Sequence, residues 1–520
     1  MKRRRKKAKF KGFFKSYLSG FFRAALVAVL VLVQFLFVFS LAIWLRTAGI
    51  YVYFGIQVVA FVIIICLLNR HTNYLFKISW LSMISLIPIA GLLMYFLWGQ
   101  ERTLHKIKKT GELLLHYGDR FEIFDEEIEN EFVSKFPGER EQMLYLKNQG
   151  CPIYKDNTFE YFPSGEEAFE AVIEDIENAK SFIFMSFFIV ADGGLWRRIK
   201  PILVEKAEQG IEIRLIYDDF GSMFRTDKEI WREIEEAGVQ VGCFNPIHKY
   251  IAKLYLNYRN HQKIIVIDGN IGYTGGFNLA DEYVNAITRF GYWKDGGVRI
   301  TGPGVFGMTR TFLDMWGTVK HGNNEDYNKY RPNDHFEKNE RFCQSISDGP
   351  LDSEAKIESA IIQMIYKAKD LMYISTPYLI MEDSLSDALC TAARSGVDVR
   401  IVLPGIPDKK SVYELSKYNC GKLLGNGVKV FVFTPGFVHN KCYITRDCAL
   451  VGSVNVDYRS FYLHFECGTF MWDHELVDDI KSDFMELFGQ CHEMTYEEWK
   501  NRPLGEKMKQ WFINIFAALM

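Results

Sequence analysis

The sequence predicts an α/β protein with two tandem repeats, each a mixed or parallel sheet with flanking helices, preceded by an α-helical membrane anchor. Three observations lead to this fold class. Long stretches near the amino terminus carry no charge, strand and helix patterns alternate from residue 151 onward, and the second part of that region repeats the first. A chain of 520 residues, of which 48% are hydrophobic, has room for about three domains with cores of their own.

Residues 1–23 form a polybasic head in which Lys and Arg are interleaved with Phe. This composition could bind nucleic acid, but the residues that follow indicate a membrane. Residues 24–45, 50–69 and 79–98 contain no charged side chain, and each stretch is long enough to cross a hydrocarbon core of about 30 Å. We expect three transmembrane helices in a multi-pass protein of the cell membrane, with the head on the cytoplasmic side against anionic lipid.

The side of the membrane on which the rest of the chain lies is less directly indicated. Three crossings from a cytoplasmic head would place everything after residue 99 outside, and this is the side that we expect. Lysines and an arginine within residues 102–109, and later cysteines without a pairing pattern, favour the opposite side. If the first stretch lies on the surface or is re-entrant, the expectation is reversed. The ten cysteines include no CxxC pair, so they indicate neither a disulfide framework nor a zinc site.

Residues 100–150 are charged and mostly helical in pattern, which predicts a connector between the anchor and the repeats. The first repeat, residues 151–344, begins with an amphipathic helix and continues with a buried strand. Its expected helices are 165–180, 195–209 and 230–237, and its expected strands are 182–189, 211–217 and 239–244. Alternation of strand and helix implies a parallel-rich sheet with helices on both faces.

The second repeat, residues 345–520, follows the same order and ends in a helix. Copied segments establish the repeat: residues 179–186 parallel 368–375, and the strand that follows Gly210 parallels the one that follows Gly396. Its expected helices are 353–369, 384–395 and 411–426, and its expected strands are 371–375, 397–403 and 428–433.

The first repeat carries His261 and Lys263 just before an apolar strand at 264–267. Two residues apart on a strand, both side chains leave from the same face. An imidazole beside an ammonium suits a phosphate, because one can attack or move protons while the other holds negative charge. Asp268, the third residue of this motif that is expected to be catalytic, follows in a turn, and a second strand leads to Gly275. A single copy of this short motif would be a weak indication of catalysis.

A second copy strengthens the indication. His439 and Lys441 repeat the motif near the other end of the chain, and Gly452 to Asn455 repeat the signature Gly275 to Asn278. The second copy departs in one place: Arg446 stands where aspartate is expected, and Asp447 comes one residue late. Either the turn is reshaped and Asp447 substitutes, or the second motif has lost its carboxylate.

Two further segments have alternative interpretations. The loop 247–260 before the first histidine is rich in Tyr and Leu, and is either a lip that meets lipid or, as we favour, an ordinary packed insertion. The tail has apolar residues at helical spacing, among them Leu504, Met508, Trp511 and Phe512. It could lie on the membrane surface, but the favoured interpretation is a helix packed on the second repeat.

The paired motifs, each followed by a G(G/S)xN signature, resemble those of the phospholipase D superfamily, and nearly the whole chain resembles bacterial cardiolipin synthases. Segments 290–295 and 457–460 contribute to this resemblance. It implies that His261 is the nucleophile and that His439 is the general acid and base. It also implies the residues that support them: Asp295 and Glu466 orient the histidines, Asn278 and Asn455 complete the phosphate cradle, and Gly275 and Ser453 belong to the two signatures.

The implied reaction transfers a phosphatidyl group from one phosphatidylglycerol to another, releasing glycerol. Lys263 and Lys441 would neutralise the phosphate, so neither a metal nor another cofactor is expected. The expected partners are phosphatidylglycerol and membrane phospholipid, without nucleic acid, because the basic residues concentrate ahead of the spans. The alternatives are a membrane-bound phospholipase D, a nuclease, or a non-catalytic membrane scaffold with a degenerate second motif. The sequence does not indicate an oligomeric state.

Overall fold

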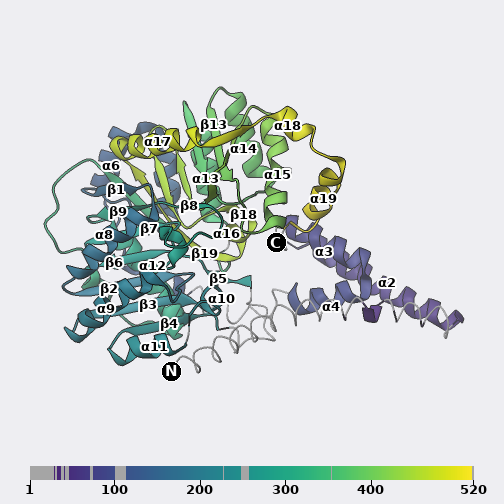
Figure 1. Ribbon diagram of the computed structural model, residues 1–520, viewed down its shortest axis with the longest axis horizontal. Helices are drawn as coiled ribbons and strands as arrows, with labels where there is room; N and C mark the ends of the chain where they lie inside the picture. Colours follow the sequence, from purple (N-terminus) through teal and green to yellow (C-terminus); the bar gives the residue numbers. More distant parts are fainter. Residues whose placement is uncertain are drawn as a thin grey trace. The chain divides into compact units, whose positions relative to one another are not determined.

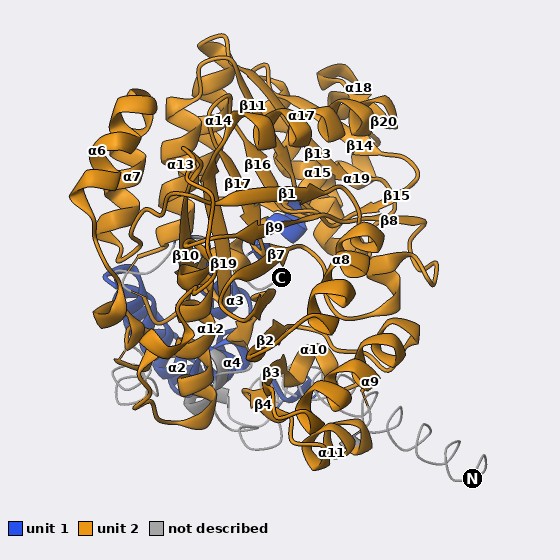
Figure 2. Ribbon diagram, turned by 90° about the vertical axis from the view of Figure 1, so that its left-hand side faces the viewer, with its two compact units in different colours: residues 1–105, 250–255, 511–520 blue, residues 106–249, 256–510 orange. Residues whose placement is uncertain are grey.

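The computed structural model describes isolated residues between 29 and 40 and then residues 46–70, 74–99, 113–226, 228–246, 257–352 and 354–517. The polybasic head and almost all of the predicted first span therefore lie outside the described residues, as does most of the loop 247–260. The chain forms two compact units (Figure 2). One consists of residues 1–105, 250–255 and 511–520, and the other of residues 106–249 and 256–510.

The first unit contains a long apolar helix, α2 (Arg46–Leu68). Within α2, Ile50–Leu68 is the one segment of the described residues that is long and apolar enough to cross a membrane, in agreement with the second predicted span. The predicted third span is not one helix. It is divided between α3 (Tyr74–Leu86) and α4 (Pro88–Trp98). Pro88 begins α4, where its missing N–H costs no hydrogen bond.

The helices α3 and α4 form a tight hairpin. A Cβ atom on Gly91 would lie 2.6 Å from the Met83 carbonyl oxygen and 2.8 Å from the Ile84 Cα. In one continuous helix, residues seven apart lie about 10 Å apart along the axis, so α4 folds back against α3. At 13 and 11 residues, the two helices measure about 20 and 16 Å, too short for a hydrocarbon core. The prediction of a third span at 79–98 is therefore wrong.

The second unit contains two sheets with the same strand order (Figure 1). The first sheet has the order β1-β9-β7-β6-β2-β3-β4, in which β2, β3 and β4 are parallel and the other pairs are antiparallel. Its strands are β1 (Thr158–Phe162), β2 (Phe182–Phe187), β3 (Glu212–Asp218), β4 (Gln240–Phe244), β6 (Ile264–Ile267), β7 (Ile271–Gly275) and β9 (Gly297–Thr301). Its helices are α8 (Gly165–Glu177), α9 (Gly194–Glu208), α11 (Lys228–Glu236) and α12 (Val305–Lys320).

The second sheet has the order β10-β19-β17-β16-β11-β13-β14-β20, which repeats the first sheet strand for strand and adds β20 at one edge. Its strands are β10 (Phe342–Asp348), β11 (Leu371–Ser375), β13 (Asp398–Pro404), β14 (Lys429–Phe433), β16 (Cys442–Ile444), β17 (Ala449–Gly452), β19 (His464–Trp472) and β20 (Cys491–Met494). Its helices are α13 (Lys356–Lys367), α14 (Asp383–Arg394), α15 (Lys410–Leu424) and α17 (His474–Gly489). The predicted duplicated α/β fold with mixed sheets is confirmed, although the boundary expected between residues 344 and 345 falls inside β10.

The helices form because their apolar residues recur on one face. In α8, Ala168, Phe169, Val172 and Ile176 are buried at helical spacing, and the Ser164 hydroxyl accepts a hydrogen bond from the Glu167 N–H to cap the helix. The connector contains α6 (Glu126–Lys135) and α7 (Arg140–Asn148), whose buried side chains join the core of the second sheet. The helix α12 is buried along most of its length because it contacts strands of the first sheet and also β10.

Candidate active site

Two short strand pairs cross from one repeat to the other and position the site. In the first, β5 (Arg259–Asn260) runs parallel to the start of β19, with Arg259 opposite His464. His261 follows β5 directly, and its backbone N–H donates to the Phe465 carbonyl at 2.9 Å. The pairing therefore places His261 of the first repeat beside Glu466 of the second.

The second pair reverses this relation. The strand β8 (Tyr292–Lys294) runs parallel to β15 (Gly436–Val438), with Lys294 opposite Val438. Asp295 follows β8 and His439 follows β15, and the His439 N–H donates to the Lys294 carbonyl at 2.7 Å. Each histidine is thus placed next to a carboxylate from the other repeat.

The two histidine–carboxylate contacts are short and buried. His261 Nδ1 lies 2.9 Å from Glu466 Oε1, and His439 Nδ1 lies 2.8 Å from Asp295 Oδ2. Burial alone would raise the pKa of each carboxyl group, but His261 holds that of Glu466 well below its usual range and His439 lowers that of Asp295. An ionised carboxylate only accepts hydrogen bonds, so each Nδ1 carries the proton and each Nε2 keeps its lone pair.

The histidines themselves are neutral in this state. Burial lowers the pKa of His261 well below its ordinary value of 6.5, against the opposing effect of Glu466. Burial, with the charge of Lys441, lowers the pKa of His439 to about 4. Removal from water penalises the charged imidazole more than the carboxylates favour it. Near neutral pH both side chains are ready to attack or to accept a proton.

The two lysines are both buried at this site. Lys263 Nζ donates to the carbonyl oxygen of His261 at 2.5 Å, and Lys441 Nζ donates to that of His439. Burial lowers the pKa of Lys263 to about 8 and that of Lys441 well below 10.5, and the Lys263 charge also lowers the pKa of Lys441 and of His439. The two motifs therefore share one electrostatic site, and buried cations that destabilise each other favour an anion between them.

The glycine-rich signatures allow this close packing. A Cβ on Gly275 would lie 2.5 Å from the Gly296 oxygen, and one on Gly276 would lie 2.0 Å from Asp295 Oδ1. In the second repeat Ser453 takes the place of Gly276, and its hydroxyl donates to Glu466 Oε2. The signature residues thus make room for one carboxylate and hold the other.

The two signature asparagines support loops. Asn278 Oδ1 accepts from the Ile189 N–H at 3.0 Å, and its Nδ2 donates to the Tyr283 hydroxyl at 2.8 Å. The Asn455 backbone N–H donates to Ser460 Oγ at 3.2 Å, whereas its side-chain Oδ1 has no hydrogen-bond partner within the described part of the chain. Their expected contact with a phosphate stays a prediction.

The aspartates of the two motifs lie away from the histidines. Asp268 stands beyond the far end of β6, where its carboxylate accepts from the backbone N–H groups of Lys180, Ser181 and Phe182 at 2.6 to 3.0 Å. Strands rise about 3.3 Å per residue, so the seven residues from His261 separate the two side chains widely. Asp268 is therefore corrected from a catalytic to a structural residue.

In the second repeat an ion pair stands where Asp268 accepts hydrogen bonds in the first. Arg446 replaces Asp268, and its Nη1 lies 3.1 Å from the carboxylate of Asp370, the residue that corresponds to Ser181. Asp447 is only half-buried and its nearest ionic partner is His474, at 3.8 Å. Asp447 thus neither substitutes for Asp268 nor joins the site, and the departure in the motif leaves the second histidine unaffected.

Sequence reasoning missed the aromatic surroundings of the histidines. The rings of Tyr283, Trp293 and Phe437 lie 5.2 to 5.8 Å from the His439 ring. Around His261 stand Phe188, at 5.3 Å, and His464, at 5.2 Å. The sequence could have indicated Trp293 and His464, because each lies two residues before an orienting carboxylate.

One group of donors within the described residues could hold a metal ion. Ligand atoms of His261, His464 and Glu466 lie within 4.8 Å of one another. The two lysines already supply positive charge to the site, and the expectation that no metal takes part stays a prediction.

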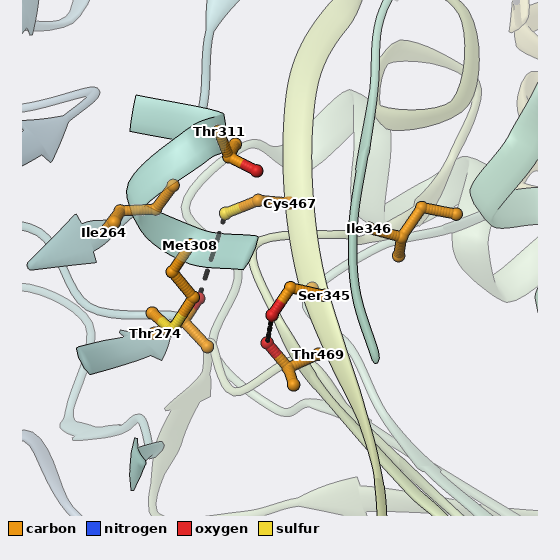
Figure 3. Close-up of a pocket in the computed structure, with 9 residues that line it drawn as sticks. Ile264, Thr274, Met308, Thr311, Ser345, Ile346, Cys467 and Thr469 are labelled. Atoms are coloured by element: carbon orange, nitrogen blue, oxygen red, sulfur yellow. Dashed lines mark hydrogen bonds between the residues drawn. The ribbon is translucent and has the colours of Figure 1, made fainter. Parts of the chain in front are cut away.

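A small pocket lies between the repeats (Figure 3). Its walls include Ile264 and Cys467, which follow Lys263 and Glu466 in the chain. Thr274 Oγ1 lies 3.8 Å from Cys467 Sγ, and Ser345 Oγ lies 3.0 Å from Thr469 Oγ1. The first contact joins β7 of the first sheet to β19 of the second, whereas Ser345 and Thr469 are opposite residues of β10 and β19 within the second sheet. The pocket is thus lined by residues of both repeats and by neither histidine.

Taken with the duplicated sheets, two imidazole–lysine pairs in one buried site have the chemical groups of an enzyme that transfers phosphate esters. Residues 172–288 and 361–488 match the family described as "Cardiolipin synthase, PLD-like domain", and residues 56–100 match "Phospholipase D-nuclease N-terminal". A cardiolipin synthase of Listeria monocytogenes serotype 4a is 34% identical over 454 residues, which cover 85% of this chain and 93% of the relative. The chain belongs to the bacterial cardiolipin synthase family of the phospholipase D superfamily.

One further named relative agrees with this assignment, and two more comparisons show similarity of sequence or of fold. A cardiolipin synthase of Oceanobacillus iheyensis is 34% identical over 455 residues, covering 85% of this chain and 93% of the relative. A protein of Streptococcus mutans is 37% identical over 467 residues, covering 88% of this chain and 99% of the relative. The crystal structure of a Haemophilus influenzae phosphatidylserine synthase aligns with a TM-score of 0.55 and 15% identity over 73% of this chain and 98% of that chain, a likeness of fold.

Proposed function

We propose that this protein is a cardiolipin synthase that transfers the phosphatidyl group of one phosphatidylglycerol to a glycerol hydroxyl of another and releases glycerol. One observation carries the proposal: two neutral histidines, each oriented by a carboxylate of the other repeat, share a buried site with two lysines. The site has the groups needed to bind a phosphodiester, to attack it and to move protons.

In the first half of the reaction, His261 Nε2 attacks phosphorus and the bond from phosphorus to the glycerol oxygen breaks. The bound phosphate brings a negative charge that raises the pKa of His439, so His439 takes up a proton and passes it to the departing oxygen. The product is a phosphatidyl–His261 intermediate and free glycerol. Glu466 stabilises the positive charge that His261 gains, and Lys263 and Lys441 stabilise the phosphate oxygens.

In the second half, His439 Nε2 accepts the proton of the incoming hydroxyl, whose oxygen attacks phosphorus. The bond from His261 to phosphorus breaks, and His261 returns to its neutral state. In this mechanism one histidine acts on each side of the phosphate, so both motifs are required. A non-catalytic scaffold is disfavoured because His439, Lys441 and Asp295 keep the same contacts as their counterparts.

We further propose that the chain crosses the membrane twice, through residues 24–45 and through the segment Ile50–Leu68 of α2. The short hairpin of α3 and α4 would enter the membrane and return to the same side. An even number of crossings places the repeats on the side of the polybasic head, in the cytoplasm. All ten cysteines are free, as a reducing compartment requires.

The last helix, α19 (Leu504–Asn514), provides a second membrane contact in this proposal. Its apolar stripe is exposed, with Leu504 at 72%, Trp511 at 63% and Phe512 at 55% of full accessibility. The helix does contact the second repeat, as the favoured expectation had it, but through its polar side and not through the apolar stripe. The opposite side of the helix carries Gln510, which is buried and donates to Glu414 at 2.8 Å. An amphipathic helix held in this way is suited to lie at the bilayer surface.

The function is tested with purified protein and vesicles that contain phosphatidylglycerol. We expect cardiolipin and glycerol to form in equal amounts, and we expect His261→Ala to form neither while remaining folded. Phosphatidic acid as the only lipid product would show a hydrolase. The absence of both cardiolipin and glycerol with the unaltered protein would overturn the proposal.

A further inference from the structure

The two halves of the site have corresponding residues, and His464 of the second repeat stands at the position of Trp293 in the first. Trp293 and His464 each lie two residues before an orienting carboxylate, Asp295 or Glu466. Both occur where a strand of one repeat crosses to the other, in β8 and at the start of β19. The duplication therefore places them at equivalent positions.

Their contacts are also equivalent. Trp293 Nε1 donates to Asp295 Oδ2 at 3.3 Å, and the indole ring lies 5.2 Å from the His439 ring. His464 Nδ1 lies 3.5 Å from Glu466 Oε1, and its ring lies 5.2 Å from the His261 ring. Each side chain thus contacts both a carboxylate and the histidine that this carboxylate orients.

The surroundings of the two carboxylates complete the comparison. Asp295 accepts from His439, Trp293 and the Gly296 N–H. Glu466 accepts from His261 and the Ser453 hydroxyl, and His464 Nδ1 occupies the third position. The side chain of His464 is 12% exposed, and its Nδ1 lies 3.5 Å from Glu466 Oε1 without a hydrogen-bond partner in the described part of the chain. A nitrogen this close to an ionised carboxylate favours the tautomer with the proton on Nδ1.

We propose that His464 is a positioning residue of the nucleophile half: as an Nδ1–H donor it holds the Glu466 carboxylate against His261, as Trp293 holds Asp295 against His439. The inference rests on the proposed function, because it assigns a role in the same transfer reaction. His464 should therefore affect the rate of attack on phosphorus, since Glu466 stabilises the charge that His261 acquires in that step. Substrate binding by the lysines is not involved.

Three substitutions of His464 test whether this side chain donates a hydrogen bond or only fills space. His464→Asn keeps an N–H donor near the position of Nδ1, His464→Asp has nearly the same shape but only accepts, and His464→Leu fills space without a polar atom. The phosphatidyl–enzyme intermediate formed in a single turnover and the steady-state rates are measured with phosphatidylglycerol vesicles, and thermal unfolding checks the fold. We expect His464→Leu and His464→Asp to lower kcat and the rate of formation of this intermediate about 10- to 100-fold, with KM within about twofold.

The proposal requires rescue by asparagine, whose rate should lie within about threefold of the unaltered enzyme. Equal rates for His464→Leu and the unaltered protein would overturn it, and so would a His464→Asn variant as slow as His464→Asp. The comparison of Asn with Asp remains decisive if the leucine variant does not fold. Failure of the unaltered protein to make cardiolipin would count against the proposed function instead, so the two failures are distinguishable.

Discussion

At the scale of single residues, the orienting carboxylates determine which nitrogen of each histidine is available for chemistry. Glu466 and Asp295 are fully buried and ionised, and each contacts the Nδ1 atom of one histidine. A neutral amide in place of either carboxylate could also donate a hydrogen bond, which would favour the tautomer with the proton on Nε2. The lone pair needed for attack or proton transfer would then be lost.

We therefore expect Glu466→Gln and Asp295→Asn each to lower kcat by about 10²- to 10⁴-fold, as for a tautomer-fixing carboxylate elsewhere. Vesicle binding and thermal stability are measured beside the rate. Glu141→Gln is the matched control, because that carboxylate is exposed on the connector. A decrease of less than about threefold in both site variants would contradict the assigned roles.

The depressed pKa of His439 predicts a dependence of stability on pH. Folded His439 titrates at about 4, whereas an unfolded histidine titrates near 6.5. Between these values the unfolded chain binds a proton that the folded protein does not, so stability falls as the pH falls, by up to about 1.4 kcal/mol per pH unit. Melting temperatures from pH 7 to 4.5 should decline less steeply for His439→Gln than for the unaltered protein. Parallel curves would count against a buried neutral histidine.

At the scale of elements, most helices and strands of the repeats could be predicted because local patterns determine them. The strand at 371–375 is found as expected, and the helix expected at 195–209 is observed as α9. The break at Pro88 was missed because the absence of charge and the length of a stretch indicate a membrane span but not whether the helix is continuous. The packing of α4 on α3 depends on Gly91, whose role is visible only once the helices meet.

The hairpin of β6 and β7 depends on Asp268, and this gives a prediction for folding. Asp268→Ala removes an acceptor for three backbone N–H groups at a residue with φ of 54°. We expect a loss of stability of about 1–3 kcal/mol, with the specific activity of the folded fraction retained. Chemical denaturation measures the loss, and Asp447→Ala, at a half-buried site, should change stability by less than about 0.5 kcal/mol. A folded but inactive Asp268→Ala protein would restore the catalytic role first expected.

At the scale of the whole molecule, sequence could identify the two motifs but not how they combine. The resemblance implied that Asp295 and Glu466 orient the histidines. Which carboxylate serves which histidine depends on the strand pairs β5–β19 and β8–β15, and these join residues about 150 to 200 positions apart. No local pattern indicates such pairing. His464 was overlooked for the same reason, since its meaning depends on Trp293 in the other repeat.

The proposed topology predicts which positions a membrane-impermeant thiol reagent can reach. In intact cells Thr47→Cys, between the two proposed spans, should be labelled, whereas Asn501→Cys, exposed beside the second repeat, should be labelled only after permeabilisation. The unaltered protein provides the background from its native cysteines. Labelling of Asn501→Cys in intact cells would place the repeats outside and restore three crossings.

The exchange of carboxylates between repeats restricts how the duplicated halves can evolve. A second gene copy ordinarily leaves one copy free to diverge, but here His261 and His439 each contact an acid encoded in the other half. A change that inactivates one half deprives the other of its orienting group as well. Neither half can therefore complete the site alone. A single ancestral repeat with this site would have functioned only as a symmetric dimer.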